Sequence, residues 1–177
     1  RLYKLGEQGV AERGFQSFLK AVTDAVNVAN AAYQRDGGLA GISTGLIDLD
    51  KKLGGLHPSD LLILAGRPSM GKTSLATNIA FNAANRLLLD IEMGIEQSAS
   101  VGAATAFFSL EMSADQLATR LLSEEARISG DRIRRGEIGQ RDFDRFVEVS
   151  REISSLPLWI DDTPAITISA LRTRCRR

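Results

Sequence analysis

The sequence predicts an α/β fold in which a mainly parallel sheet is flanked by helices on both faces. Short apolar runs at 61–65, 104–110 and 156–160 alternate with segments of helical period. Strands that alternate with helices in this way form parallel sheets joined by helical crossovers. The expected order from residue 61 is therefore strand, helix, strand, two helices, strand and helix.

Composition limits the kind of protein. The 177 residues include 22 basic and 22 acidic side chains, so a formal net charge of zero gives no overall attraction to polyanions. The single cysteine, Cys175, excludes an internal disulfide and fits a reducing, cytoplasmic compartment. No apolar run reaches the roughly twenty residues that span a bilayer, so no membrane partner is expected. The chain starts at Arg1 and ends in a helical pattern, which predicts a fragment.

The strongest motif is the segment 66–73, Gly-Arg-Pro-Ser-Met-Gly-Lys-Thr, which matches the phosphate-loop spacing GxxxxGK[ST]. An apolar run precedes it and a helical pattern follows, which favours a phosphate loop over an ordinary Gly/Pro turn. Backbone amides and the helix N-terminus would then capture phosphate groups. The predicted nucleotide-binding residues are Gly66, Arg67, Pro68, Ser69, Met70, Gly71, Lys72, Thr73 and Ser74.

Two of these residues have specific predicted roles. Lys72 would reach the terminal phosphates as a point charge, and is also a candidate catalytic residue. Thr73 would present its hydroxyl to Mg²⁺ and is the one predicted metal ligand. One Cys and one His cannot form a zinc site or a nucleophilic triad, and His57, beside a proline in a turn, is expected to be exposed.

Acidic residues follow the two later strands, at the edge of a parallel sheet where ligands bind. Glu111 is the predicted catalytic base, positioned to orient or deprotonate an attacking water. The alternative is that Glu111 only sits in the first turn of a helix, where its negative charge interacts favourably with the helix dipole. Glu92 is a second candidate for the catalytic base, but no clear strand precedes it. Asp161 and Asp162 are interpreted as structural, or as groups that support the site without binding Mg²⁺ directly, because Thr163-Pro164 is typical of a helix-initiating turn.

The remaining pattern is mostly helical. A helix is predicted from Phe15 until just before Asp36, packing on its own domain or on a neighbouring subunit. Further helices are expected within 42–56, 72–85, 130–139 and 140–154, whereas 86–104 is expected to be a partly ordered connection. Ser113 with Gln116 predicts a capping box, and Ser169 a cap for the last helix. The arginines at 172–177 form either a phosphate-binding cluster or, more commonly, a solvated helix face.

Four segments, in order, resemble the bacterial replicative DNA helicases of the DnaB type. They are 44–50 (Thr-Gly-Leu-Ile-Asp-Leu-Asp), 66–73, 108–113 (Phe-Ser-Leu-Glu-Met-Ser) and 160–164 (Ile-Asp-Asp-Thr-Pro). The resemblance implies a RecA-like P-loop ATPase domain that binds ATP and Mg²⁺ through Lys72 and Thr73, with Glu111 catalytic. It also implies a homo-hexameric ring that moves 5′ to 3′ along single-stranded DNA and unwinds the duplex. Primase and a helicase loader are the further partners that the resemblance implies.

The resemblance divides the chain into a linker segment, 1–38, and a partial ATPase domain, 39–177. The helix at 17–34 is then the linker that docks on the adjacent subunit. The family's Walker-B strand, DNA-binding loops and arginine finger are expected beyond Arg177, so the fragment is expected to be inactive alone. Segment 86–104 departs from the family pattern.

Two alternatives remain open from the sequence. A recombinase-like or clock-like RecA ATPase fits residues 44–73 nearly as well, but 108–113 and 160–164 less well. A nucleotide-binding module that only controls assembly, without hydrolysis, has the same phosphate loop and differs in the role of Glu111.

Overall fold

The computed structural model describes residues 15–34 and 39–176. Its contacts group into two units, Arg1–Gly38 and Leu39–Arg177. The predicted lead-in 1–14 and the predicted glycine cap at 37–38 lie outside the described residues.

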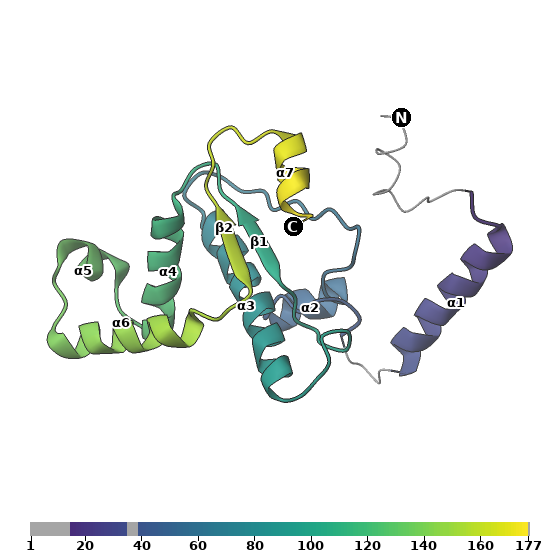
Figure 1. Ribbon diagram of the computed structural model, residues 1–177, viewed down its shortest axis with the longest axis horizontal. Helices are drawn as coiled ribbons and strands as arrows, with labels where there is room; N and C mark the ends of the chain where they lie inside the picture. The colour runs from purple at the N-terminus through teal and green to yellow at the C-terminus, as the bar shows by residue number, and fades with distance from the viewer. Residues whose placement is uncertain (1–14, 35–38, 177) are drawn as a thin grey trace, which may run out of the picture. The chain divides into compact units, whose positions relative to one another are not determined.

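The first unit contains one helix, α1 (Phe18–Gln34), in the part that the structure describes (Figure 1). Its apolar side chains recur at helical spacing, as predicted, although the helix begins three residues after Phe15. These side chains are exposed, with Phe18 at 84%, Leu19 at 78% and Val26 at 61%. The helix therefore presents an exposed apolar stripe along the described part of its length.

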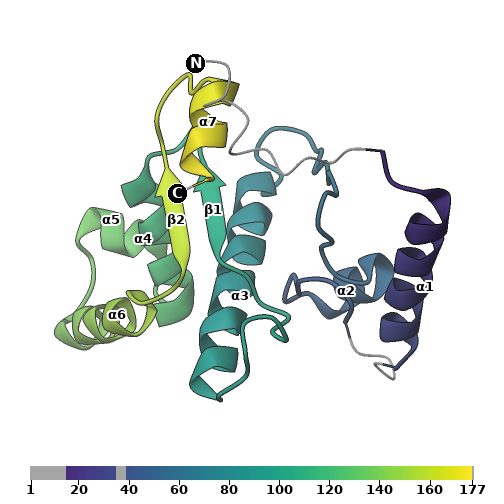
Figure 2. The same ribbon diagram turned by 45° about the vertical axis from the view of Figure 1, so that its right-hand side comes forward.

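The second unit is built on two parallel strands, β1 (Thr105–Phe108) and β2 (Leu158–Asp161), paired in register from Thr105↔Leu158 to Phe108↔Asp161. Figures 1 and 2 show the helix α3 alongside both strands. The helices of this unit are α2 (Ile47–Leu53), α3 (Lys72–Glu92), α4 (Ala114–Ala126), α5 (Gly130–Arg135), α6 (Gln140–Ile153) and α7 (Ile168–Arg174).

The sheet has one covered face in the described part of the chain. Leu158 and Ile160 line a small hollow together with Phe81 of α3 and Leu121 of α4. Side chains alternate between faces along a strand, so Trp159 points the other way, and it is 62% exposed. The expected cover by helices is thus seen on the α3 and α4 side, while Trp159 lines a hollow bordered by Arg174 and Cys175 at the end of α7.

The predicted strand at 61–65 is not formed. No backbone hydrogen bond links 61–65 to β1, β2 or any other described segment, and Leu61 and Ile63 are 84% and 82% exposed. An apolar sequence becomes a strand only when a neighbouring strand completes its hydrogen-bond ladder. Within the described residues β1 and β2 pair only with each other, so this segment is extended but unpaired.

Segment 86–104 is more ordered than predicted, because α3 continues to Glu92 and the chain then returns along it. The buried carboxylate of Asp90 accepts a hydrogen bond from Ser100 Oγ (2.7 Å) and lies 2.9 Å from Arg86 Nε. The Ser100 bond and then the Arg86 charge hold the pKa of Asp90 below its usual value, despite burial. A Cβ on Gly102 would lie 2.1 Å from the Leu87 backbone nitrogen, so only glycine allows this close return.

Segment 43–50 is held by another buried carboxylate. Asp50 of α2 accepts hydrogen bonds from Ser43 Oγ (2.7 Å) and from the backbone and hydroxyl of Thr44 (2.8 and 2.7 Å). Burial alone would raise the pKa of Asp50, but the bonds from Thr44 and Ser43 bring it below the usual value. Asn82 of α3 donates to the Thr44 carbonyl (3.0 Å), which ties 44–50 to α3.

The helix caps test the local predictions directly. Ser113 is the N-cap of α4 and forms the predicted capping box with Gln116. The Ser169 prediction was wrong, because Thr167 caps α7 by accepting from the Ala170 amide (3.2 Å). Both residues have suitable hydroxyls, and the helix begins at Ile168, which places Ser169 inside its first turn.

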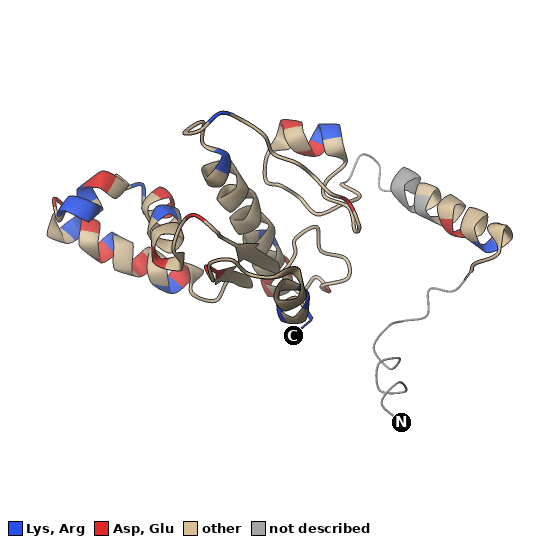
Figure 3. Cartoon of the chain, turned by 90° about the horizontal axis from the view of Figure 1, so that it is seen from above, with Lys and Arg blue, Asp and Glu red and all other residues tan. Residues whose placement is uncertain are grey.

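The helices α4, α5 and α6 enclose a separate apolar cluster. Its buried members are Ala126, Ile128 and Val149. The outer surface of α5 and α6 mixes charges of both signs (Figure 3), with an ion pair between Arg132 and Asp142 (3.1 Å). This end of the unit therefore carries no single-sign surface that would attract a polyanion strongly.

Candidate functional site: a phosphate loop facing an acidic turn

The phosphate loop, residues 66–73, is exposed up to Gly71 and turns sharply into α3. Ser69 and Gly71 have φ angles of 63° and 81°, in the left-handed region. Alternation of this kind can direct backbone amides into a concavity that suits an anion, although the Met70 amide donates to the Arg67 carbonyl (3.3 Å). Gly71 is also the N-cap of α3 and provides no side chain to cap it.

Lys72 folds back over this loop. Its ammonium donates to the carbonyls of Gly66 (3.0 Å) and Arg67 (3.1 Å). These bonds hold a positive charge beside the amides of the loop, in a position that phosphate oxygens could take over.

The loop fits the nucleotide phosphates that its sequence predicts. A Cβ added to Gly71 would meet no atom within 4 Å, so the space before the α3 N-terminus is open. The amides of the first turn of α3, including Thr73 and Ser74, lack a side-chain cap and face this space. Lys72 would hold the phosphates there and the Thr73 hydroxyl would hold Mg²⁺.

Two contacts set α4 beside α3 in a parallel orientation. Arg120 Nη1 donates to Ser74 Oγ (3.1 Å), and Asn78 Nδ2 donates to Glu124 Oε1 (2.9 Å). Both pairs are separated by 46 residues, so the helices run in the same direction with a constant offset. The N-terminus of α4 therefore lies at the phosphate-loop end of α3.

Glu111 occupies the turn at this same end, between β1 and α4, where it is exposed. It precedes α4 by three residues and is not part of the helix first turn, which removes the simple dipole interpretation. Glu92 is the last residue of α3, about 30 Å from the phosphate loop at 1.5 Å per residue. Of the two candidate bases, Glu111 therefore lies toward the phosphate-loop end of α3 and Glu92 at the opposite end.

Asp161 and Asp162 each bind protein groups. Asp161 accepts a close hydrogen bond from Arg174 and another from the Thr163 amide (3.0 Å). The Arg174 bond lowers the pKa of Asp161 to about 2, with Thr163 contributing. Asp162 accepts from the Ala114 amide at the start of α4 (2.9 Å). These contacts agree with the structural interpretation of both residues.

The arginine cluster divides into two kinds of side chain. Arg174 points back to Asp161 and Thr163, whereas Arg172 and Arg176 are exposed. His57 is exposed, as predicted. In residues 15–34 and 39–176, no cluster of three or more His, Cys, Asp or Glu is arranged to hold a metal, and no helix is long and apolar enough to cross a membrane.

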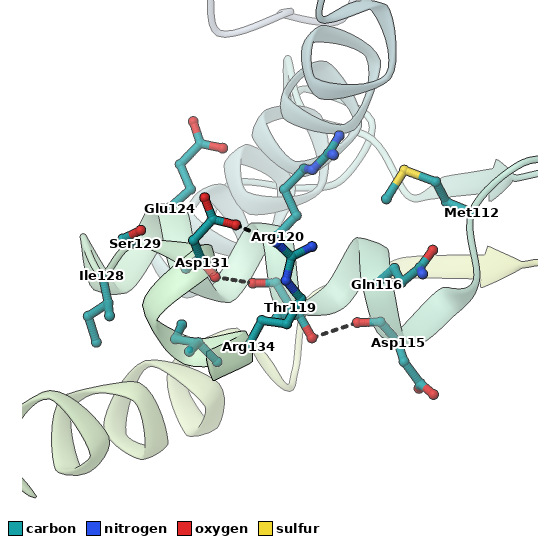
Figure 4. Close-up of a pocket in the computed structure, with 13 residues that line it drawn as sticks. Met112, Asp115, Gln116, Thr119, Arg120, Glu124, Ile128, Ser129, Asp131 and Arg134 are labelled. Atoms are coloured by element: carbon teal, nitrogen blue, oxygen red, sulfur yellow. Dashed lines mark hydrogen bonds and ion pairs between the residues drawn. The ribbon is translucent and has the colours of Figure 1, made fainter. Parts of the chain in front are cut away.

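Sequence reasoning missed Arg120. It lies on α4 at the edge of a hollow of about 840 Å³ between α4 and α5, and Figure 4 shows it extending toward α3. An arginine on the exposed side of an amphipathic helix carries no signal of its own. Only the parallel packing of α4 against α3 brings it to Ser74.

The parallel strands, the phosphate loop at the start of α3 and the acidic turn after β1 define a RecA-like P-loop fold. One solved structure, described as an ATPase domain, superposes with a TM-score of 0.74 at 24% identity, covering 92% of this chain and 52% of that one. A second, described as a DnaB-like replicative helicase and its interactions with primase, gives 0.70 at 23% identity, covering 99% and 38%.

The model of the family described as the DnaB-like helicase C terminal domain matches residues 41–177. The replicative DNA helicase DnaB of Rickettsia bellii is 47% identical over 177 residues, which is all of this chain and 35% of that protein. The chain belongs to the DnaB-like helicase C-terminal domain family, and it spans about a third of the length of this relative. This membership decides against the recombinase-like and clock-like alternatives.

Proposed function

We propose that this chain is the nucleotide-binding part of a replicative helicase motor, which hydrolyses ATP to move along DNA. The observation that carries the proposal is the shared location of the phosphate loop and the Glu111 turn, at the same end of the parallel helices α3 and α4. Membership of the DnaB-like helicase C-terminal domain family supports a helicase function for this arrangement.

In this proposal the Thr73 hydroxyl would hold Mg²⁺, and the ion would supply positive charge to offset that of the phosphates. Lys72 exchanges the carbonyls of Gly66 and Arg67 for phosphate oxygens, so its ammonium keeps hydrogen-bond partners throughout. The backbone amides of 69 and of 71–74 would donate to the phosphates, whereas the Met70 amide already donates to the Arg67 carbonyl (3.3 Å). Glu111 orients the attacking water and accepts its proton.

The wider role is also a proposal. The motor would work as a homo-hexamer in the cytoplasm, translocating 5′ to 3′ on single-stranded DNA and unwinding the duplex. The exposed apolar stripe of α1 supports docking on an adjacent copy, in a head-to-tail contact that can close into a ring. Primase is supported as a partner by the solved relative described with primase, and a loader by the family resemblance alone.

The test uses a full-length protein that carries this chain, with Lys72→Ala and Glu111→Gln. Lys72→Ala should weaken ATP binding and lower hydrolysis by roughly 10²–10³-fold, because a preorganised charged donor is lost. Glu111→Gln should bind ATP normally and hydrolyse it about 10²–10⁴-fold more slowly, as expected for loss of a general base. Binding is measured with a fluorescent ATP analogue, turnover by phosphate release, and unwinding on a forked duplex.

The matched control is Lys52→Ala, which removes an exposed lysine from α2 and should change none of the three measurements. Retained hydrolysis in Lys72→Ala would reject the role of Lys72. Unchanged hydrolysis in Glu111→Gln would instead support the non-hydrolysing assembly module, or a different base.

A further inference from the structure

The turn that carries Glu111, residues 109–113, is fixed at both of its ends; it is called the glutamate turn below. At its start, the Ser109 amide donates to the Asp161 carbonyl (2.8 Å), extending the β1–β2 ladder by one bond. Ser109 is 7% exposed, and its hydroxyl donates to the Met112 carbonyl (2.6 Å) and accepts from the Met112 amide (3.0 Å). Glu111 therefore projects from a closed loop of hydrogen bonds.

At its other end, the glutamate turn runs into α4, where two different residues satisfy the first amides. Ser113 accepts from the Gln116 amide within the capping box. It cannot also reach the amide of Ala114, the first helical residue, and Asp162 does so from 48 residues away (2.9 Å). This bond links the end of β2 directly to the turn that carries Glu111.

The residues on either side of Asp162 hold it in position. The adjacent Asp161 is held by Arg174 and by the Thr163 amide, and Arg174 also donates to Thr163 Oγ1 (2.8 Å). Asp161 closes the β1–β2 register opposite Phe108. With residues 161 and 163 fixed, Asp162 has a defined position between β2 and α4.

We propose that Asp162 is a positioning residue for hydrolysis, which fixes the glutamate turn so that Glu111 stands where the attacking water is activated. This rests on the proposed catalytic role of Glu111. Among the described residues Asp162 forms no hydrogen bond with the phosphate loop, and its side chain accepts from the Ala114 amide, so we expect it to act through that amide. A shift of about 1 Å in a catalytic group can cost about 10²-fold in rate, while phosphate binding by Lys72 would be unaffected.

The test compares kcat with nucleotide affinity in a full-length protein that carries this chain. Asp162→Ala should lower kcat about tenfold or more and leave the KM for ATP and the affinity for an ATP analogue within about twofold, since only the placement of Glu111 changes. Asp162→Asn keeps an oxygen acceptor for the Ala114 amide and should restore most of the rate. Asp115→Ala removes another exposed acid from the α4 first turn without touching this bond, and should leave kcat unchanged.

A double variant separates positioning from other roles. In Glu111→Gln the base is already lost, so adding Asp162→Ala should lower the residual rate by less than about twofold, since residues that act as one unit are not additive. A full tenfold further loss would overturn the proposal. So would a raised KM for ATP or Mg²⁺ in Asp162→Ala, which would indicate direct ligation, or an Asp162→Asn variant as slow as Asp162→Ala.

The outcomes also distinguish this proposal from the function on which it rests. If Glu111→Gln hydrolyses ATP normally, the catalytic role of Glu111 fails and positioning by Asp162 falls with it. If Glu111→Gln is slow and Asp162→Ala is fast, only the positioning role is rejected. Far-UV circular dichroism and the thermal midpoint of each variant identify any loss of rate that comes from unfolding.

Discussion

The two loops that form the proposed site are held very differently. The phosphate loop and the segment before it are exposed from 59 to 71, and their backbone hydrogen bonds are short-range turns such as Met70 to Arg67 (3.3 Å). The glutamate turn has a buried Ser109, a ladder bond to Asp161 and a long-range bond from Ala114 to Asp162. The glutamate turn is held by contacts with distant parts of the fold. The phosphate loop is held by its own local turn and by Lys72.

This contrast suggests that the two loops have different tasks in the proposed reaction, the glutamate turn acting on water and the phosphate loop binding phosphates. A group that must act on water needs fixed geometry before the substrate arrives, because reorganisation at the moment of reaction costs rate. A loop that wraps phosphates can gain its order from the ligand, since the new charge-assisted hydrogen bonds offset the loss of conformational freedom.

The largest expected difference is in amide hydrogen exchange. Without nucleotide, the amides of Arg67, Ser69 and Gly71 should exchange at least about 100-fold faster than those of Ser109, Met112 and Ala114, because no backbone hydrogen bond protects them in the described part of the chain and their exchange needs no opening step. An ATP analogue with Mg²⁺ should slow the phosphate-loop amides strongly and the glutamate turn little. Exchange resolved by residue, with and without nucleotide, is the measurement. Equal protection of the two loops before nucleotide is added would contradict the comparison.

A matched pair of serine substitutions tests the same contrast through stability. Ser109→Ala removes a buried hydroxyl that both donates to and accepts from Met112, and should cost about 1–3 kcal/mol in free energy of unfolding. Ser69→Ala makes the same chemical change in the exposed phosphate loop and should stay within about 0.5 kcal/mol. Urea unfolding of both variants without nucleotide measures the difference. Similar costs at the two serines would show that Ser109 does not anchor the glutamate turn.

The same division explains which predictions from sequence succeeded. The capping box at Ser113 and Gln116, the strand β1 and the acid after it depend on signals within a few residues. From Lys72 onward the order of helices and strands was predicted for this reason, except that three helices, α4, α5 and α6, lie between β1 and β2 where the predicted order had two. The start of α3 at Lys72 was also predicted from the spacing of 66–73, while phosphate binding by this loop stays a prediction.

The errors arose where distant residues decide. The strand at 61–65 has the right composition but finds no partner strand among the described residues. The extension of α3 to Glu92 depends on Asp90 meeting Ser100 and on Gly102 passing close to Leu87. Asp162 was recognised as structural, but its partner, Ala114, is 48 residues away and could not be named from the sequence.

The smallest expected effect concerns acid. The pKa of Asp161 is about 2, below the ordinary value of 3.8, because Arg174 holds the carboxylate. The unfolded chain therefore binds a proton here first as pH falls, so the stabilisation is complete above pH 3.8 and is lost as the pH falls through about 2. Arg174→Ala should raise the pKa of Asp161 toward its ordinary value and so reduce this part of the acid sensitivity. Urea midpoints measured from about pH 5 to about pH 2 give the comparison.

The exposed Arg172 provides the control, since Arg172→Ala removes the same charge from α7 without touching Asp161. If the two arginine variants lose stability in acid equally, the Asp161–Arg174 pair does not set the response.

We also expect acid to act first at the contacts around Asp161. Protonation of Asp161 frees the residues that aim Asp162, so the Ala114 amide should lose protection near a pH of about 2 before the rest of α4 unfolds. The phosphate loop, which has no bond to Asp161 or Asp162 among the described residues, should exchange as before once the intrinsic pH dependence of exchange is subtracted.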